Sequence, residues 1–361
     1  MGKRALVLGG GAPNFTLMSG ALLALHRAGV TFDLVYMAGA GGVVGLVYLA
    51  PKGLTPDEAL QNTMNYGISD QIYSMVPINY KLFNKGGPAA ESFRDAWSSL
   101  PPVQAAMHQF GMTDEQKLAA DWLLFQGAMM CPNDVNYFNT GVCAHVPFIE
   151  GVVDFDKLKA PTTPDHALNA YCIEHHKIVE FWKPCLDVHH FRAALSFPYI
   201  YPPYRIGDHT YYEGAAIDSL NLIGAMEGEK KHADIDTVVL FDIVRPNVIH
   251  RPRNLWDAYT QSVMLPLVAN AEKKLAIFKH WVETGSVVKP PPRHMPEELH
   301  AIFSGQNFPV PPNINAFTVN FEIPESYQPY MLEWSKSNLE NLFTMGYEAG
   351  QRFLLNQGAK L

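Results

Sequence analysis

The feature that most constrains the fold is a pair of short apolar segments near the N-terminus, each running directly into glycines. "RALVL" at residues 4–8 precedes three glycines, and "DLVYMAG" at 33–39 leads into a second glycine-rich turn. Residues 16–28 carry a helical pattern that Gly29 would end, and 43–50 can form a buried helix. Strand, helix, strand and helix in this order predict a parallel sheet covered by helices.

The composition is that of a globular protein able to bury a large core. Of its 361 residues, 48% are hydrophobic and 17% are charged, which excludes an intrinsically disordered chain. The formal net charge of −8 argues against a nucleic-acid partner, because binding to phosphate backbones requires a basic face. The four cysteines form no C-x-x-C pair, so neither a zinc ribbon nor a thioredoxin motif is indicated.

Two apolar stretches raise the question of export or membrane insertion. The N-terminal run is too short for a signal peptide and breaks into glycines. Residues 34–50 are uncharged and mostly apolar, but their glycines favour a strand, a tight turn and a buried helix over a membrane span. The chain is therefore expected to be soluble and cytoplasmic, with peripheral membrane contact and homo-oligomerisation left open.

No repeat, low-complexity tract or linker divides the chain, which predicts a single domain over residues 1–361. Residues from about 54 to 130 are mostly helical in pattern and are expected to be a helical insertion. A mainly helical C-terminal extension is expected over about 245–361. It contains a long amphipathic stretch at 255–284 and a Pro-rich excursion over the surface at 287–313.

The first glycine-rich segment has the character of an anion site. Gly9, Gly10 and Gly11 lie between a predicted strand and a predicted helix, where backbone N–H groups can bind negative charge. A dinucleotide fingerprint would need glycine at position 14, which is Asn14, and the G-K-[ST] of a P-loop is missing. A nucleotide cofactor is therefore not expected.

The second glycine-rich segment has the crowding of a nucleophile elbow without a nucleophile. A G-x-S-x-G elbow places its serine on a sharp strand-to-helix turn and needs small residues around it. Here Gly39, Gly41 and Gly42 supply the small residues, and Ala40 stands at the serine position.

The most specific stretch is "AALSFPYIYPPYRIGDHTYYEGAAIDS" at residues 193–219. At this point the chain resembles the patatin-like phospholipase family, which has a glycine-rich loop, an elbow one strand later, and a D-G-[GA] motif. That motif follows a run of the form A-x-S-x-x-P and then P-P. The positions that match or nearly match the run and the motif are Ala193, Ser196, Pro198, Pro202-Pro203 and Glu213-Gly214-Ala215.

The resemblance implies an α/β fold, a three-layer sandwich with a mainly parallel central sheet covered by helices. It also implies acyl hydrolysis by a serine–aspartate dyad without histidine and without a cofactor. The serine attacks an ester carbonyl while the aspartate accepts its proton, and the glycine-rich loop forms the oxyanion hole. On this chain that loop is Gly9, Gly10, Gly11 and Ala12, and the implied ligand is a lipid acyl chain or another hydrophobic small molecule.

Several parts of the family pattern are altered together. Ala40 has no nucleophile, and Glu213 stands at the aspartate position, where one extra methylene moves the carboxylate by about 1 Å and can cost on the order of 100-fold in rate. Pro13 and Asn14 replace the basic residue and the glycine after the three glycines. Because the elbow, the loop and the acid all differ, the pattern favours natural divergence over one introduced substitution.

Two functions remain open from the sequence. The chain is either an acyl hydrolase whose serine has been replaced at Ala40, or a diverged non-hydrolase. The second would use the pocket to bind a hydrophobic molecule or use Glu213 for acid–base chemistry. If the pocket has been repurposed, the polar residues nearest the dyad positions are the candidates: Asn14, Asp208, His209, Tyr211, Tyr212 and Asp218.

The histidines do not indicate a metal site. His175-His176 and His189-His190 are adjacent pairs, and neighbouring side chains on a strand point to opposite faces. No metal is therefore expected from these spacings.

Overall fold

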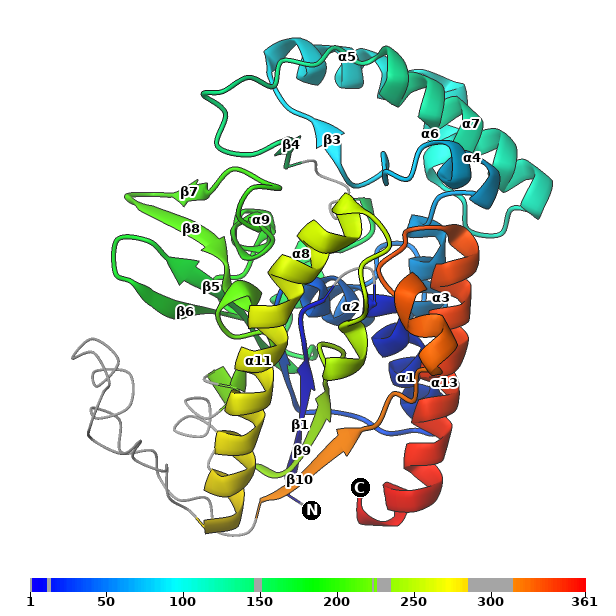
Figure 1. The fold of residues 1–361 in the computed structure, drawn as a ribbon. Helices are drawn as coiled ribbons and strands as arrows, with labels where there is room; N and C mark the ends of the chain where they lie inside the picture. Colours follow the sequence, from blue (N-terminus) through cyan, green and yellow to red (C-terminus); the bar gives the residue numbers. More distant parts are fainter. Residues whose placement is uncertain (1, 12–13, 146–150, 223, 226–234, 285–313) are drawn as a thin grey trace.

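The structure is a computed structural model that describes residues 2–11, 14–145, 151–222, 224–225, 235–284 and 314–361. Its centre is an eight-stranded sheet in the order β10-β9-β1-β2-β5-β8-β7, with β6 also paired to β5 (Figure 1). The parallel strands are β1 (Lys3–Leu8), β2 (Leu34–Met37), β5 (Asp165–Cys172), β9 (Ile235–Phe241) and β10 (Asn315–Val319). The antiparallel additions are β6 (Lys177–Trp182), β7 (Tyr204–Ile206) and β8 (His209–Glu213).

Helices cover both faces of this sheet, because alternate residues of its strands are apolar on each side. Leu6 and Leu8 of β1 belong to one buried cluster, whereas Ala5 and Val7 belong to another. Helices α1 (Phe15–Arg27), α2 (Ala40–Leu49), α3 (Pro56–Asn62) and α13 (Lys336–Gln357) pack on the first face. The long helix α11 (Leu255–Thr284) covers the second face through residues such as Trp281 (Figure 1). The expected three-layer α/β fold is confirmed.

Further helices lie above the sheet in Figure 1. They are α4 (Asp70–Met75), α5 (Pro88–Ser98), α6 (Pro101–Met107) and α7 (Asp114–Met130), next to a small ribbon of β3 (Asn84–Lys85) and β4 (Cys143–Ala144). The short helices α8 (Phe155–Leu158) and α9 (Val188–Ala194) complete the fold. A buried ion pair of 2.7 Å between Lys81 and Asp121 holds this upper region together.

The N-terminal elements follow the sequence pattern closely. Gly29 has a φ of 78° after α1, as a helix-ending glycine requires. Residues 34–50 form a strand, a turn and a buried helix, and within the described residues no helix has the length and apolarity for a membrane crossing. The predicted Pro-rich excursion at 287–313 lies outside the described residues.

The first and last helices approach each other closely because both carry glycines at the contact. A Cβ atom at Gly20 would lie 2.0 Å from the Phe343 carbonyl oxygen, and one at Gly346 would lie 2.0 Å from the Leu17 carbonyl oxygen. Backbone meets backbone here, so no flexible side chain can move aside.

We expect Gly346→Ala to lower the free energy of unfolding by about 1–3 kcal/mol, because the added methyl group overpacks this contact. Gly358→Ala is the matched control, since its Cβ would meet only ordinary contacts at 3.9 Å and its φ is −55°. Urea unfolding of both variants measures the difference. Equal stability of the two would contradict the close α1–α13 packing.

Candidate active site

The turn after β2 bends the chain sharply at Gly39. β2 ends at Met37, and α2 begins at Ala40. Between them Gly39 has φ 45° and ψ −121°, a backbone conformation in which a side chain is strained. A Cβ at Gly41 would lie 2.2 Å from the Leu8 carbonyl oxygen, so the turn is pressed against the end of β1.

Glu213 is brought to this turn through β5, which pairs with both strands concerned. Met37 at the end of β2 is opposite Leu168, and Glu213 at the end of β8 is opposite Ala170, two residues further along β5. The Glu213 backbone N–H also donates to the Ser196 carbonyl at 3.0 Å. The carboxyl group therefore lies directly at the turn: a Cβ built on Gly39 would be 2.1 Å from its Oε1 atom.

The three motifs found in the sequence meet at one residue. A Cβ at Gly39 would be 2.9 Å from the Ala215 methyl group, and a Cβ at Gly10 would be 2.6 Å from the same group. The glycine-rich loop, the elbow and the Glu213-Gly214-Ala215 motif thus form a single site at the carboxyl ends of the parallel strands. Ligand sites in open α/β sheets lie at this edge.

The carboxyl group of Glu213 is isolated. No hydrogen-bond or ion-pair partner for it occurs in the described part of the chain, and burial raises its pKa to about 8. At neutral pH this group is therefore mostly the neutral acid, which can donate a proton. Near pH 8 a large share is the carboxylate, which can accept a proton.

Two of the four predicted oxyanion donors are already used. Gly9 N–H donates to the Phe241 carbonyl at 3.1 Å, and Gly10 N–H donates to the Ser219 carbonyl at 2.5 Å. For Gly11 N–H and for Ala40 N–H, no acceptor occurs among the described residues. Ala12 lies outside those residues.

The remaining elbow positions serve packing. The Ala40 side chain is 7% exposed and belongs to the apolar cluster beneath α1 and α2. A Cβ at Gly42 would lie 2.8 Å from a methyl group of Leu168. Asn14 precedes α1 and is buried, and its side-chain oxygen has no hydrogen-bond partner among the described residues.

The polar candidates of the "GDHTYYEG" segment separate in space. Asp208 and His209 lie at the tip of the β7–β8 hairpin, where Asp208 is 3.9 Å from Arg205 and the Nε2 atom of His209 is 2.9 Å from that of His175. Since β8 is extended, its four residue steps span about 13 Å between this tip and Glu213.

Tyr211 and Tyr212 lie between these two ends on β8. Side chains alternate along a strand, so Tyr211 shares the face of Glu213, where its ring packs 5.3 Å from that of Phe181, and Tyr212 takes the opposite face. Burial raises the pKa of Tyr211.

Helix α11 supplies residues that sequence reasoning missed. Asn270 and Lys274 donate to the Ile217 carbonyl at 2.5 and 2.7 Å, and Lys274 also lies 3.4 Å from the buried carboxylate of Asp218. These contacts hold the turn after Glu213 from the far side of the sheet. No local pattern signals them, because more than 50 residues separate the partners.

An apolar groove of about 520 Å³ opens beside this turn. One wall is α11, and the other is formed by residues 197–198 and by Ala216, three positions after Glu213. The side chains around it are Phe197, Pro198, Ala216, Tyr259, Val263, Pro266, Leu267 and Asn270. None of the near-site candidates named from the sequence lines this groove.

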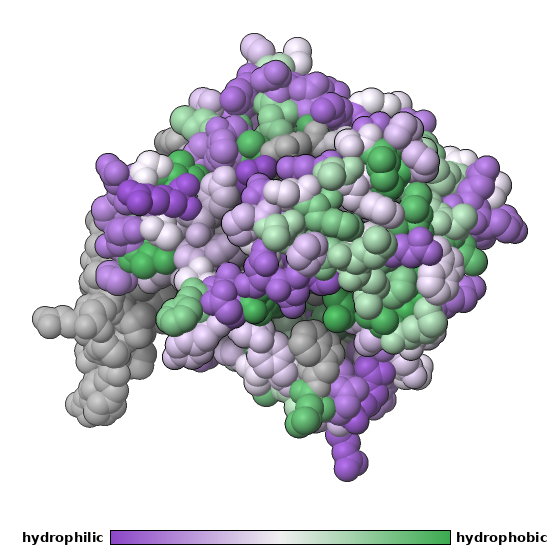
Figure 2. Space-filling view, turned by 90° about the horizontal axis from the view of Figure 1, so that it is seen from above, coloured by the Kyte–Doolittle hydropathy of each residue, from purple (hydrophilic) through white to green (hydrophobic). Residues whose placement is uncertain are grey.

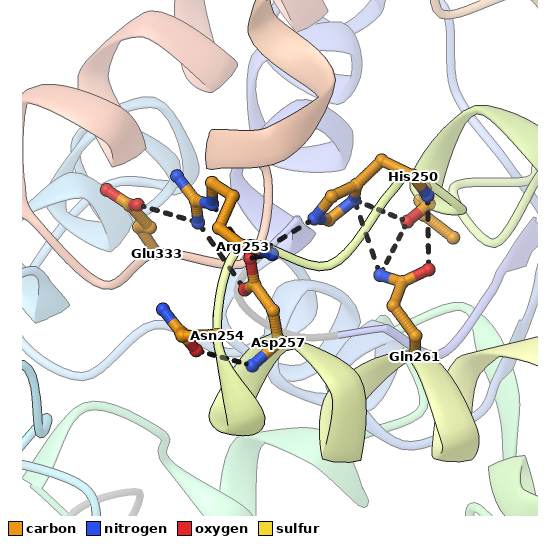
Figure 3. Close-up of polar contacts among 7 residues, drawn as sticks. His250, Arg253, Asn254, Asp257, Gln261 and Glu333 are labelled. Atoms are coloured by element: carbon orange, nitrogen blue, oxygen red, sulfur yellow. Dashed lines mark hydrogen bonds and ion pairs between the residues drawn. The ribbon is translucent and has the colours of Figure 1, made fainter.

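A polar cluster fixes the beginning of α11 (Figure 3). Arg253 contacts Asp257 at 2.7 Å and Glu333 at 3.3 Å, so it joins α11 to the segment before α13. Gln261 accepts a hydrogen bond from the His250 backbone at 3.1 Å, and the ring of His250 lies 3.7 Å from the Asp257 carboxylate. The groove wall is thereby held in place by contacts outside the groove.

No three metal-ligating side chains gather anywhere in the described ranges.

A strained strand-to-helix turn, a facing carboxyl group and a glycine-rich loop define the site type of α/β acyl hydrolases. The sequence model of the patatin-like phospholipase family matches residues 6–226, more than half of the chain. The chain therefore belongs to the patatin-like phospholipase family, and the resemblance seen in the motifs is confirmed.

The other comparisons are weaker. No curated protein matches the chain. Among solved structures, VipD from Legionella pneumophila is 11% identical, with a TM-score of 0.38, over 98% of this chain and 67% of its own. Similarity at that level carries no information about the site.

The raised pKa of Glu213 predicts that the protein loses stability as the pH rises from about 4 to about 8. The folded state holds this proton up to about pH 8, whereas the unfolded chain loses it near pH 4.3. The stability that the bound proton of Glu213 contributes is therefore fully present below the pKa of the unfolded chain. It is lost as the pH rises to the pKa of the folded protein.

We expect Glu213→Gln, which stays neutral, to gain stability over the wild type by several degrees of Tm between pH 5 and pH 9. Thermal unfolding across this range measures the effect, with the exposed Glu325→Gln as control. A difference between wild type and Glu213→Gln that does not change with pH would rule out the raised pKa.

Proposed function

We propose that this chain binds a hydrophobic, acyl-type ligand on a patatin-like fold and does not hydrolyse esters by the serine route. The observation that carries the proposal is the contact between Glu213 and Gly39. The carboxyl group fills the space beside the elbow in which a nucleophilic hydroxyl would stand. Neither residue 39 nor residue 40 offers a nucleophile.

The apolar groove supports an acyl chain as the ligand. Its volume is about 520 Å³, and it is a shallow groove that is largely open to solvent. Leu267, Val263 and Phe197 offer aliphatic and aromatic surface, and the groove begins near the turn that carries Glu213. A ligand with an apolar tail in the groove could bring its polar end towards this carboxyl group.

Exposed apolar side chains above the sheet support a lipid surface as the source of such a ligand. Figure 2 looks down on α4–α7 and shows hydrophobic residues among hydrophilic ones on this face. Those that are more than half exposed on these helices or in the loops beside them are Met75, Ile78, Met107, Met129, Met130, Tyr137 and Phe138. The transfer of such apolar side chains from water into lipid is favourable, because it removes apolar surface from water.

Acid–base chemistry at Glu213 is the second candidate, favoured by its pKa of about 8. A neutral carboxyl group can donate its proton to a ligand oxygen, and the resulting carboxylate can remove a proton from a neighbouring carbon of the same ligand. Neither transfer requires a cofactor.

We expect the wild type to bind a long-chain fluorescent fatty acid and to remain unlabelled by a fluorophosphonate. Val263→Trp should weaken binding by about tenfold or more, because the indole fills the groove. Leu265→Trp lies on the same helix but is 52% exposed outside the groove and serves as the control. Fluorescence titration measures the affinity for the fatty acid, and intact-mass measurement detects any fluorophosphonate label.

Serine-type labelling of the wild type would disprove the loss of hydrolysis. Equal affinities of the two tryptophan variants would place the ligand outside the groove.

A further inference from the structure

We propose that position 39, and not position 40, is the nucleophile position of this site, and that Glu213 occupies the space vacated there. The inference rests on the family membership and on the geometry of the turn. It does not depend on which ligand the groove binds.

The backbone gives the first reason. A nucleophile elbow holds its reactive residue on the strained residue between strand and helix. That residue is Gly39, with φ 45° and ψ −121°, whereas Ala40 is the first residue of α2. A side chain at 39 leaves the turn towards Glu213, whereas the Ala40 methyl group is part of the apolar cluster.

The backbone donors give the second reason. An oxyanion hole uses the N–H of the residue after the nucleophile together with one from a neighbouring loop. After position 40 comes Gly41, whose N–H already donates to the Ala38 carbonyl at 2.8 Å. After position 39 comes Ala40, whose N–H has no acceptor in the described part of the chain. The residue after the nucleophile therefore has an N–H available for the oxyanion only if residue 39 is the nucleophile.

The reach of the acid gives the third reason. A Cβ at 39 would be 2.1 Å from Oε1 and 3.1 Å from Cδ of Glu213, so a serine at 39 requires the glutamate carboxyl group to swing away from the turn. Removing one methylene from the acid withdraws the carboxyl group by about 1 Å, somewhat less than the full length of one carbon–carbon bond. Glycine at 39 and glutamate at 213 are thus matched to each other, as serine and aspartate would be.

The proposal predicts that two substitutions together rebuild a reactive dyad. In Gly39→Ser/Glu213→Asp, the introduced hydroxyl attacks the phosphorus of a fluorophosphonate. An oxygen–phosphorus bond forms, the phosphorus–fluorine bond breaks, fluoride leaves, and the hydroxyl proton passes to the carboxylate at 213. The matched control is Ala40→Ser/Glu213→Asp, in which the hydroxyl stands one residue later.

Both double variants are incubated with the fluorophosphonate and examined by intact mass and peptide mapping. We expect one equivalent of label at position 39 in the first variant and none at position 40 in the control. Labelling at position 40, or no labelling of a folded first variant, overturns the proposal. Fatty-acid titration of the wild type separately tests the proposed function, so the two failures can be distinguished.

A stability cycle tests the same contact without any reaction, and applies even if the first variant does not fold. Gly39→Ala should lower Tm strongly in the wild-type background and clearly less in the Glu213→Asp background, because the shorter acid leaves room for the methyl group. Strain from the positive φ is the same in both backgrounds and cancels. Equal losses of Tm would overturn the proposal.

Discussion

The contact between Gly39 and the carboxyl group of Glu213 is the constraint around which the site is organised. It exists because β5 pairs with β2 over its first half and with β8 over its second half. The same register places Ala215 against both glycine-rich turns. The patatin-like scaffold thus brings these segments together, with Gly39 and Ala40 at the elbow and Glu213 facing them.

Burying a carboxyl group without a partner is unfavourable when it is charged. Glu213 avoids most of this cost by remaining protonated to a pKa of about 8. The surroundings of the turn are by contrast well supported: Asn169 donates to the Asp218 carbonyl at 2.9 Å, and α11 contributes Asn270 and Lys274 on the other side. An apolar site around one proton-bearing group fits the ligand binding that we propose.

The sequence predicted the parts of the site that are local. The strand, turn and helix order around residues 4–50 follows from apolar runs and glycines, and the structure has these elements within a few residues of the expected bounds. The three motif blocks were found because each has its own short pattern. The "GDHTYYEG" segment misled for the same reason: residues close in sequence stand far apart on an extended strand, so Asp208 and His209 lie at the opposite end of β8 from Glu213.

By itself, the sequence determined the family, the three-layer fold and the absence of a serine at the elbow, because these depend on residue types and on local periodicity. Only the tertiary structure decided which elbow residue faces the acid, which backbone donors are already engaged, and that α11 forms a groove beside the site. Strand register and helix docking set these relations. Register and docking bring together residues that are dozens to hundreds of positions apart in the chain, and no local sequence pattern predicts such contacts.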